Sequence, residues 1–278
     1  KSIGIYDNFF DLGGHSILAV SIIAKTNNEF EASFPLRWIF QYPTIASFAA
    51  EIDKYCNDFR TYPNMQFPSI TIDYDNLYDS FPLTEVQMAY WAGRNSQLGL
   101  GSISTHIYQE VEIENLDLRR FSEAFNKVIR RHHMLRAVIT SDGRQRILEN
   151  VPVYEIKTHN LKGTSEEEKR LRLEAVRQEL SHQVLKDSDW PLFDVQASIL
   201  DDELTRLHIS FDLLIADAWS FQILLREIAY FYANPEGELQ NMDISFRDYV
   251  IAYEKLLAQP IYAKAKEYWE RRLDSIPP

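Results

Sequence analysis

The hydrophobic pattern changes character once along this chain, from helical spacing alone to a mixture of helical and alternating spacing, and that change limits the possible folds more than any other feature. In residues 1–54 apolar side chains recur only at helical spacing, as with Ile17, Val20 and Ala24. In residues 73–278 helical stretches alternate with stretches in which every second residue is apolar. The sequence therefore predicts an α-helical domain followed by an α+β domain.

Residues 55–72 separate the two expected domains. They lack a periodic apolar pattern and contain Asn57, Pro63 and Pro68, which are typical of a linker. The whole chain has 278 residues, enough for about two domains. The helical part offers only three short helices and a thin core, so we expect a further helix upstream of Lys1.

Caps, breakers and periodicity predict the individual elements. In the first domain, helices are expected after Ser16, at residues 36–41 and from Thr44 onward. In the second domain, Thr84 and Gln87 form a capping box that opens a helix. The remaining expected elements are a strand at 106–113, a helix from 118 into residues 130–133, a hairpin at 135–149, a long helix at 165–185, a strand at 207–213, a buried helix at 219–232 and a helical stretch at 246–273 that breaks at Pro260.

Composition excludes several classes of protein. The formal net charge of −12 argues against nucleic acid as the main partner, because phosphate backbones select basic surfaces. Cys56 is the only cysteine, which excludes an intrachain disulfide and any metal site with several cysteines. The histidines have no metal-binding spacing, so no metal is expected. The sequence has no apolar run of about 18 residues, and we expect a cytoplasmic protein without a membrane partner.

The segment DNFFDLGGHSILAV carries the first chemical signal. Gly13 and Gly14 permit a tight loop, and Ser16 stands at the start of the helix that follows. The positive end of a helix favours a phosphate group on or near such a serine. Alternatively, Ser16 serves only as the N-cap of that helix.

This segment resembles the phosphopantetheine attachment motif of peptidyl carrier domains in nonribosomal peptide synthetases. The matching residues are Asp7, Phe9, Phe10, Leu12, Gly13, Gly14, His15 and Ser16, with Ile17 in place of leucine. The resemblance implies a partial four-helix carrier bundle in which 4′-phosphopantetheine is esterified to Ser16. It also implies three kinds of partner: a phosphopantetheinyl transferase, the upstream and downstream carrier and adenylation domains of one assembly line, and carrier-bound acyl and aminoacyl substrates.

Two segments of the second domain, FPLTEVQMAYWAGR and RHHMLRAVI, resemble the first two motifs of the heterocyclization branch of condensation domains. Taken singly, their residues have ordinary explanations: Tyr90 could belong to the core, and His132 could be a cation at a helix C-terminus. Their order and distance from the carrier motif favour the family. The resemblance implies one αβ lobe of a chloramphenicol-acetyltransferase-like condensation fold, and we expect the second lobe to lie outside this chain.

The stretch HISFDLLIADAWSFQ separates two branches of that family. Ordinary condensation domains carry HHxxxDG here, and their second histidine lies near the reacting amine and thioester. This chain has Asp212 and Leu213 at the two histidine positions. Asp212, Asp217 and Ser220 instead match the DxxxxDxxS motif of heterocyclization domains, and the resemblance implies that these three residues belong to the catalytic site.

Each of these residues has an expected role. Asp212 is expected to orient the incoming amine or to shuttle protons. The resemblance implies that Asp217 forms a buried, bidentate ion pair with Arg136 of the second motif. Ser220 either caps the following helix or bonds a substrate carbonyl.

The implied reaction joins an acyl thioester to the amine of a carrier-bound Cys, Ser or Thr. The side-chain thiol or hydroxyl then adds to the new amide, and loss of water gives a thiazoline or oxazoline. The family places important cyclodehydration residues in the second lobe, so this chain alone is expected to be catalytically incomplete. Two alternatives stay open: an ordinary condensation domain that forms only an amide, and a carrier-docking half-domain without catalysis.

Overall fold

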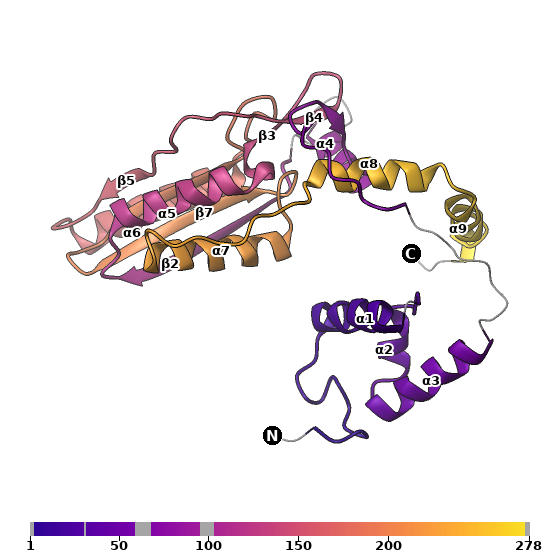
Figure 1. Ribbon diagram of the computed structural model, residues 1–278. Helices are drawn as coiled ribbons and strands as arrows, with labels where there is room; N and C mark the ends of the chain where they lie inside the picture. The colour runs from indigo at the N-terminus through magenta and orange to yellow at the C-terminus, as the bar shows by residue number, and fades with distance from the viewer. Residues whose placement is uncertain (1–2, 31, 59–67, 95–102, 276–278) are drawn as a thin grey trace. The chain divides into compact units, whose positions relative to one another are not determined.

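The computed structural model describes residues 3–30, 32–58, 68–94 and 103–275. The chain divides into two compact units, residues 1–67 and 68–278 (Figure 1).

Over its described residues the first unit has three helices, as expected. They are α1 (Ser16–Phe30), α2 (Arg37–Gln41) and α3 (Ile45–Asp58). Their apolar faces meet in a small core made of Ala19, Ile23, Phe34, Trp38, Ile39 and Ile52. Helix α3 continues through residues 55–58, where the sequence predicted the start of a linker.

The loop before α1 closes on Phe9. The amide of Gly14 donates to the carbonyl of Phe9 at 2.9 Å, and Gly13 adopts a φ of +93°, which favours glycine. A Cβ atom on Gly14 would lie 2.5 Å from the carbonyl oxygen of Phe9. Phe10 stacks on Phe40 with ring centroids 5.3 Å apart, which holds the loop against the helices. The glycine pair therefore lets the chain turn directly into α1.

The second unit is built on a four-stranded sheet in the order β2-β7-β6-β5. Its strands are β2 (His106–Glu114), β7 (Leu204–Asp212), β6 (Phe193–Ile199) and β5 (Lys157–Asn160), and only the β5–β6 pair is parallel. A smaller sheet joins β1 (Phe81–Pro82), β4 (Arg144–Ile147) and β3 (Ala137–Ile139). The pairing of β3 with β4 confirms the expected hairpin. The sequence did not predict β1, β5 or β6.

The larger sheet has one apolar face, which α5 (Leu118–Arg131) and α7 (Ala218–Ala233) cover. Alternation along the strands directs these side chains to that face: Phe193, Val195, Ala197, Leu207, Ile209 and Phe211. The intervening side chains of β6 and β7 are polar and project from the other face, where α6 (Glu166–His182) lies. This layering explains why the central strands are buried on both sides.

The polar face is held together by buried hydrogen bonds. His208 is fully buried between the Ser198 hydroxyl, 3.0 Å from Nε2, and the Tyr108 hydroxyl, 3.0 Å from Nδ1. Burial lowers the pKa of His208 to about 4, so the imidazole is neutral and satisfied by neutral hydroxyls. Tyr108 in turn donates to Glu110 at 2.8 Å. This histidine is a structural residue of the sheet.

Helix α7 departs from the sequence-based expectation. Its apolar sequence predicted burial on all sides, yet Trp219 is 46% exposed and Leu225 is 38% exposed. One stripe is buried against the sheet and α5, made of Phe221, Leu224, Ile228 and Phe231. The expectation was wrong because α7 lies in an outer layer, so only the stripe that faces the sheet can be covered.

Three further helices are α4 (Glu85–Gly93), α8 (Phe246–Leu257) and α9 (Pro260–Glu270). The capping box at the start of α4 is confirmed, with both reciprocal hydrogen bonds between Thr84 and Gln87. Pro260 occupies the first turn of α9, which confirms the expected break after α8. Val250 of α8 packs on Phe81 of β1 and Ile147 of β4, so α8 covers the smaller sheet.

We predict that Gly14→Ala destabilises the first unit by about 1–3 kcal/mol, because the added methyl group overlaps the Phe9 carbonyl. Faster hydrogen exchange of the α1 amides would report this loss. Gly4→Ala is the matched control, since its Cβ would meet only the Asp7 carboxylate at 3.4 Å. Equal exchange rates in the two variants would contradict the prediction.

Candidate functional site

A cavity of about 740 Å³ lies in the second unit where β7 ends and α7 begins. Residues of all three sequence motifs contribute to its wall. The lining residues are Thr84, Val86, Gln87, Tyr90, Ile107, His132, His133, Met134, Leu135, Leu213, Leu214, Ile215, Ala216, Asp217, Ala218, Ser220, Ile223, Leu224, Met242, Ile244, Ser245 and Phe246. The wall is mostly apolar, and among its described residues Asp217 is the one carboxylate.

Asp212 stands beside this cavity without lining it. Its side chain is only 2% exposed and forms an ion pair through Oδ2 with Arg94, the residue that ends α4. The Ser104 hydroxyl donates to the same oxygen at 2.6 Å, and the Leu214 amide donates to Oδ1 at 2.9 Å. Both carboxylate oxygens are therefore engaged within the fold, and Asp212 acts as a positioning residue. This arrangement contradicts the expected direct role in binding an amine or shuttling protons.

A second set of hydrogen bonds fixes the loop that follows Asp212. The Gln87 side-chain amide donates to the Leu214 carbonyl at 2.7 Å and to Gln145 Oε1 at 3.0 Å. Gln145 in turn donates to the Pro82 carbonyl at 2.8 Å. The first motif thus holds the cavity wall from two sides, through Arg94 and through Gln87.

Asp217 and Ser220 both line the cavity, and they bond each other. Asp217 is the N-cap of α7: its Oδ1 accepts from the Ser220 amide at 2.7 Å and from the Ser220 hydroxyl at 2.6 Å. Partial burial alone would raise the pKa of Asp217, but these hydrogen bonds outweigh it and the net shift is downward. Ser220 does not cap the helix, and its proton is already donated to Asp217 rather than free for a substrate carbonyl.

The expected ion pair between Asp217 and Arg136 is wrong. Arg136 is buried, as expected, but its guanidinium donates to the main-chain carbonyls of Leu148 and Glu149, the latter at 2.8 Å. Asp217 is exposed and holds the start of α7. Within the described residues, the buried aspartate–arginine pair at this site joins Asp212 to Arg94. Arg94 is the last residue of the first sequence motif, and that position could have identified it as a candidate partner of Asp212.

Two adjacent histidines line the cavity and differ in their hydrogen bonding. His132 Nε2 lies 2.7 Å from Glu227 Oε2, which also accepts from Arg131 at 3.0 Å. His133 is half-buried, and its imidazole makes no hydrogen bond to any residue that the structure describes. Burial lowers the pKa of His133, and the nearby Arg136 and His132 lower it further. Sequence reasoning missed His133, although it follows His132 directly in the second motif.

Ser16 begins α1 and is exposed. The glycine loop before it leaves the first turn of a 15-residue helix open to solvent, and such a turn favours an anionic group. An exposed hydroxyl at this position fits the attachment of a phosphopantetheine group. Among the described residues no cluster of three or more His, Cys, Asp or Glu side chains could hold a metal ion, and no helix is long and apolar enough to cross a membrane.

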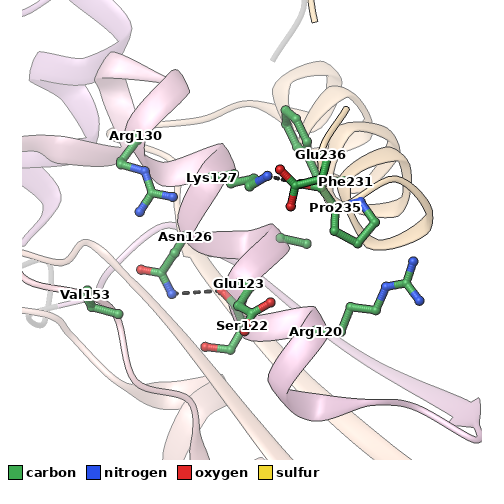
Figure 2. A pocket seen from close by; sticks show the side chains of 11 residues that line it. Arg120, Ser122, Glu123, Asn126, Lys127, Arg130, Val153, Phe231, Pro235 and Glu236 are labelled. Carbon is green, nitrogen blue, oxygen red and sulfur yellow. Dashed lines mark hydrogen bonds between the residues drawn. The ribbon is translucent and has the colours of Figure 1, made fainter. Parts of the chain in front are cut away.

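A second cavity, of about 320 Å³, lies between α5 and the segment after α7 (Figure 2). Three of its polar side chains have partners within the fold. Lys127 donates to the Pro235 carbonyl, Arg120 donates to the Ala233 carbonyl at 2.9 Å, and Asn126 donates to the Ser122 carbonyl at 2.9 Å. These contacts anchor the C-terminal end of α7 on α5, so this cavity is part of the scaffold.

Comparisons with known proteins match both units. A family described as "Condensation domain" matches residues 78–278, and one described as "Phosphopantetheine attachment site" matches residues 1–52. Bacitracin synthase 1 of Bacillus licheniformis is 34% identical over 100% of this chain and 5% of its own length. Phenyloxazoline synthase MbtB of Mycobacterium tuberculosis is 32% identical over 72% of this chain and 14% of its own length. The EpoB cyclization-docking bidomain of Sorangium cellulosum is 33% identical with a TM-score of 0.75, over 83% of this chain and 47% of that one.

The chain belongs to the condensation-domain family of nonribosomal peptide synthetases, joined to a phosphopantetheine attachment domain. It spans 5% and 14% of the two relatives named and about half of the EpoB bidomain. The expected fold class, a helical carrier region followed by an α+β condensation fold, is confirmed.

We predict that Asp212→Ala destabilises the second unit far more than Asp217→Ala does. Removing Asp212 leaves Arg94 buried without its partner and costs about 3–5 kcal/mol. Removing Asp217 deletes one helix cap and costs about 0.5–2 kcal/mol. Hydrogen exchange of the α7 amides across a urea series measures the loss of stability in each variant.

Asp202→Ala is the control for this comparison, because the Asp202 side chain is 94% exposed and pairs only with Lys162. It should leave the exchange rates unchanged. Equal losses from Asp212→Ala and Asp217→Ala would contradict the assigned roles.

Proposed function

We propose that the second unit is a heterocyclization domain, which condenses a carrier-bound acyl group with a carrier-bound Cys, Ser or Thr and then removes water. The observation that carries this proposal is Leu213 on the cavity wall, where an ordinary condensation domain has its second histidine. The DxxxxDxxS pattern of Asp212, Asp217 and Ser220 accompanies it. The names of two similar proteins, a phenyloxazoline synthase and a cyclization bidomain, support the same branch.

In this proposal the three motif residues contribute by shaping the cavity. Asp212 holds the loop at residues 213–216 through Arg94 and the Leu214 amide. Asp217 and Ser220 set the first turn of α7, which forms the adjoining wall. Asp212 uses both carboxylate oxygens within the fold, and Asp217 Oδ1 accepts two hydrogen bonds that lower the pKa of that carboxyl. The proton transfers of condensation and cyclodehydration therefore fall to other groups.

An ordinary amide-forming condensation domain is the alternative. Bacitracin synthase 1 is similar over the full length of this chain, carrier region included, and its name does not specify a heterocycle. The two functions differ by one water in the product. A carrier-docking half-domain without catalysis is the weaker alternative, because a docking surface does not require a cavity of about 740 Å³.

We further propose that Ser16 is the residue that carries 4′-phosphopantetheine, loaded by a phosphopantetheinyl transferase. When bound, this group supplies a thiol that holds an acyl chain as a thioester. Ser16 presents an exposed hydroxyl at the N-terminus of α1, and Gly13 and Gly14 leave it accessible. Because the carrier precedes the condensation domain, it acts as acyl donor, and tethering raises the effective concentration of the donor at the cavity. Upstream and downstream carrier and adenylation domains are the remaining proposed partners.

The intact mass of the product on the downstream carrier tests the heterocyclization proposal. In the multidomain synthetase with both carriers loaded, we expect a product one water lighter than the simple amide. The mass of the uncyclised amide alone would overturn the proposal and favour the ordinary condensation domain. The same reaction without the downstream amino acid serves as the baseline.

We predict that Ser16→Ala abolishes product formation while the downstream carrier still loads its amino acid. The hydroxyl is the only attachment point proposed on the first unit, so the donor chain cannot be tethered without it. Ser21→Ala is the matched control, because Ser21 is an exposed serine of the same helix and its loss should leave loading intact. Mass spectrometry of both carriers measures the outcome, and unchanged product with Ser16→Ala would refute the assignment.

A further inference from the structure

The cavity contains few groups that could accept a proton. Asp212 does not line it, and the Asp217 carboxylate accepts two hydrogen bonds from Ser220 at the start of α7. His132 is held by Glu227 at 2.7 Å. Tyr90 is a phenol, which is a poor proton acceptor.

His133 differs from each of these groups. It lines the same cavity as Leu213, Asp217 and Ser220, and its ring makes no hydrogen bond to any residue in the described part of the chain. Its backbone is nevertheless fixed, because it begins the 3₁₀ turn η3 (His133–Arg136), in which the Leu135 amide donates to the His132 carbonyl at 3.1 Å. The imidazole is thus placed on the wall by a rigid element while both ring nitrogens stay available.

The surroundings of His133 favour its neutral form. Burial lowers the pKa of the imidazole, Arg136 and His132 lower it further, and the smaller effect of Asp248 opposes them. The ring is therefore unprotonated at neutral pH and can act as a base, the state that a general base requires.

We propose that His133 supplies the imidazole that position 213 lacks and accepts the proton released when the substrate amine attacks the acyl thioester. The new bond joins the amine nitrogen to the acyl carbon, and the bond from that carbon to sulfur breaks. The proton leaves the nitrogen for His133 and passes to the departing sulfur, so the products are an amide and a thiol. This inference rests on the condensation step alone and holds whether or not cyclization follows.

His133→Gln in the multidomain synthetase tests the inference. Glutamine keeps a polar side chain of similar reach but cannot take up a proton. We expect single-turnover amide formation to slow by about 10²-fold, the usual size of a general-base contribution. His182→Gln is the matched control, since His182 ends α6 on the exposed surface, and it should retain the wild-type rate.

The pH profile separates proton transfer from a structural effect. The substrate amine titrates in both proteins, with a pKa of about 8 for a free α-amino group. The wild-type rate should show one additional protonation below the ordinary histidine value of 6.5, with loss of activity as pH falls, and His133→Gln should lack that step. A His133→Gln protein with the wild-type rate and the wild-type profile would overturn the inference.

Two further readouts keep the test decisive. His133→Ala opens space on the cavity wall, and added imidazole should restore part of its rate, whereas a variant that is merely misfolded gains nothing from imidazole. Absence of rescue together with wild-type melting would count against the inference. The product mass of the wild type reports separately on cyclization, so failure of the heterocyclization proposal and failure of the His133 assignment are distinguishable.

Discussion

The ion pair between Asp212 and Arg94 is the constraint on which the rest of the site depends. A carboxylate with 2% exposure is stable only with a charged partner and further hydrogen bonds, and Arg94, Ser104 and the Leu214 amide supply them. The pair joins the end of the central strand β7 to the end of α4. The loop at residues 213–217, and through it the first turn of α7, takes its position from this connection.

The two faces of the larger sheet explain why the cavity forms at its edge. Apolar residues on one face pack against α5 and α7. On the other face, which α6 covers, the polar side chains around His208 have hydrogen-bond partners. Both faces are therefore closed, and side chains can be presented only where strands end and loops begin. Functional residues on loops that a rigid scaffold positions are a general feature of enzymes.

The aspartate motif accordingly acts through structure. Asp212 and Asp217 each engage their carboxylates within the fold, the first with Arg94 and the second with the start of α7. The chemistry then depends on groups whose hydrogen-bonding capacity is not used by the fold, of which His133 is the example among the described residues of this wall. In this domain, the aspartates that match the motif are therefore not the residues that transfer protons.

The sequence by itself determined the order of the two units, the helices α1 to α8 that carry clear caps or periodicity, and the family, because these depend on local pattern and on residue identity. It did not predict β5, whose residues Lys157–Asn160 are all polar and form a strand through pairing with β6, and it overlooked the alternation of Phe193, Val195 and Ala197 in β6. Asp212, Asp217 and Ser220 lie at the strand-to-helix junction where the sequence pattern placed them, but the partner expected for Arg136 was wrong. Only the tertiary structure decided that Arg94 is the partner of Asp212 and that His133 faces the cavity, because residues far apart in the sequence meet through packing rather than through spacing.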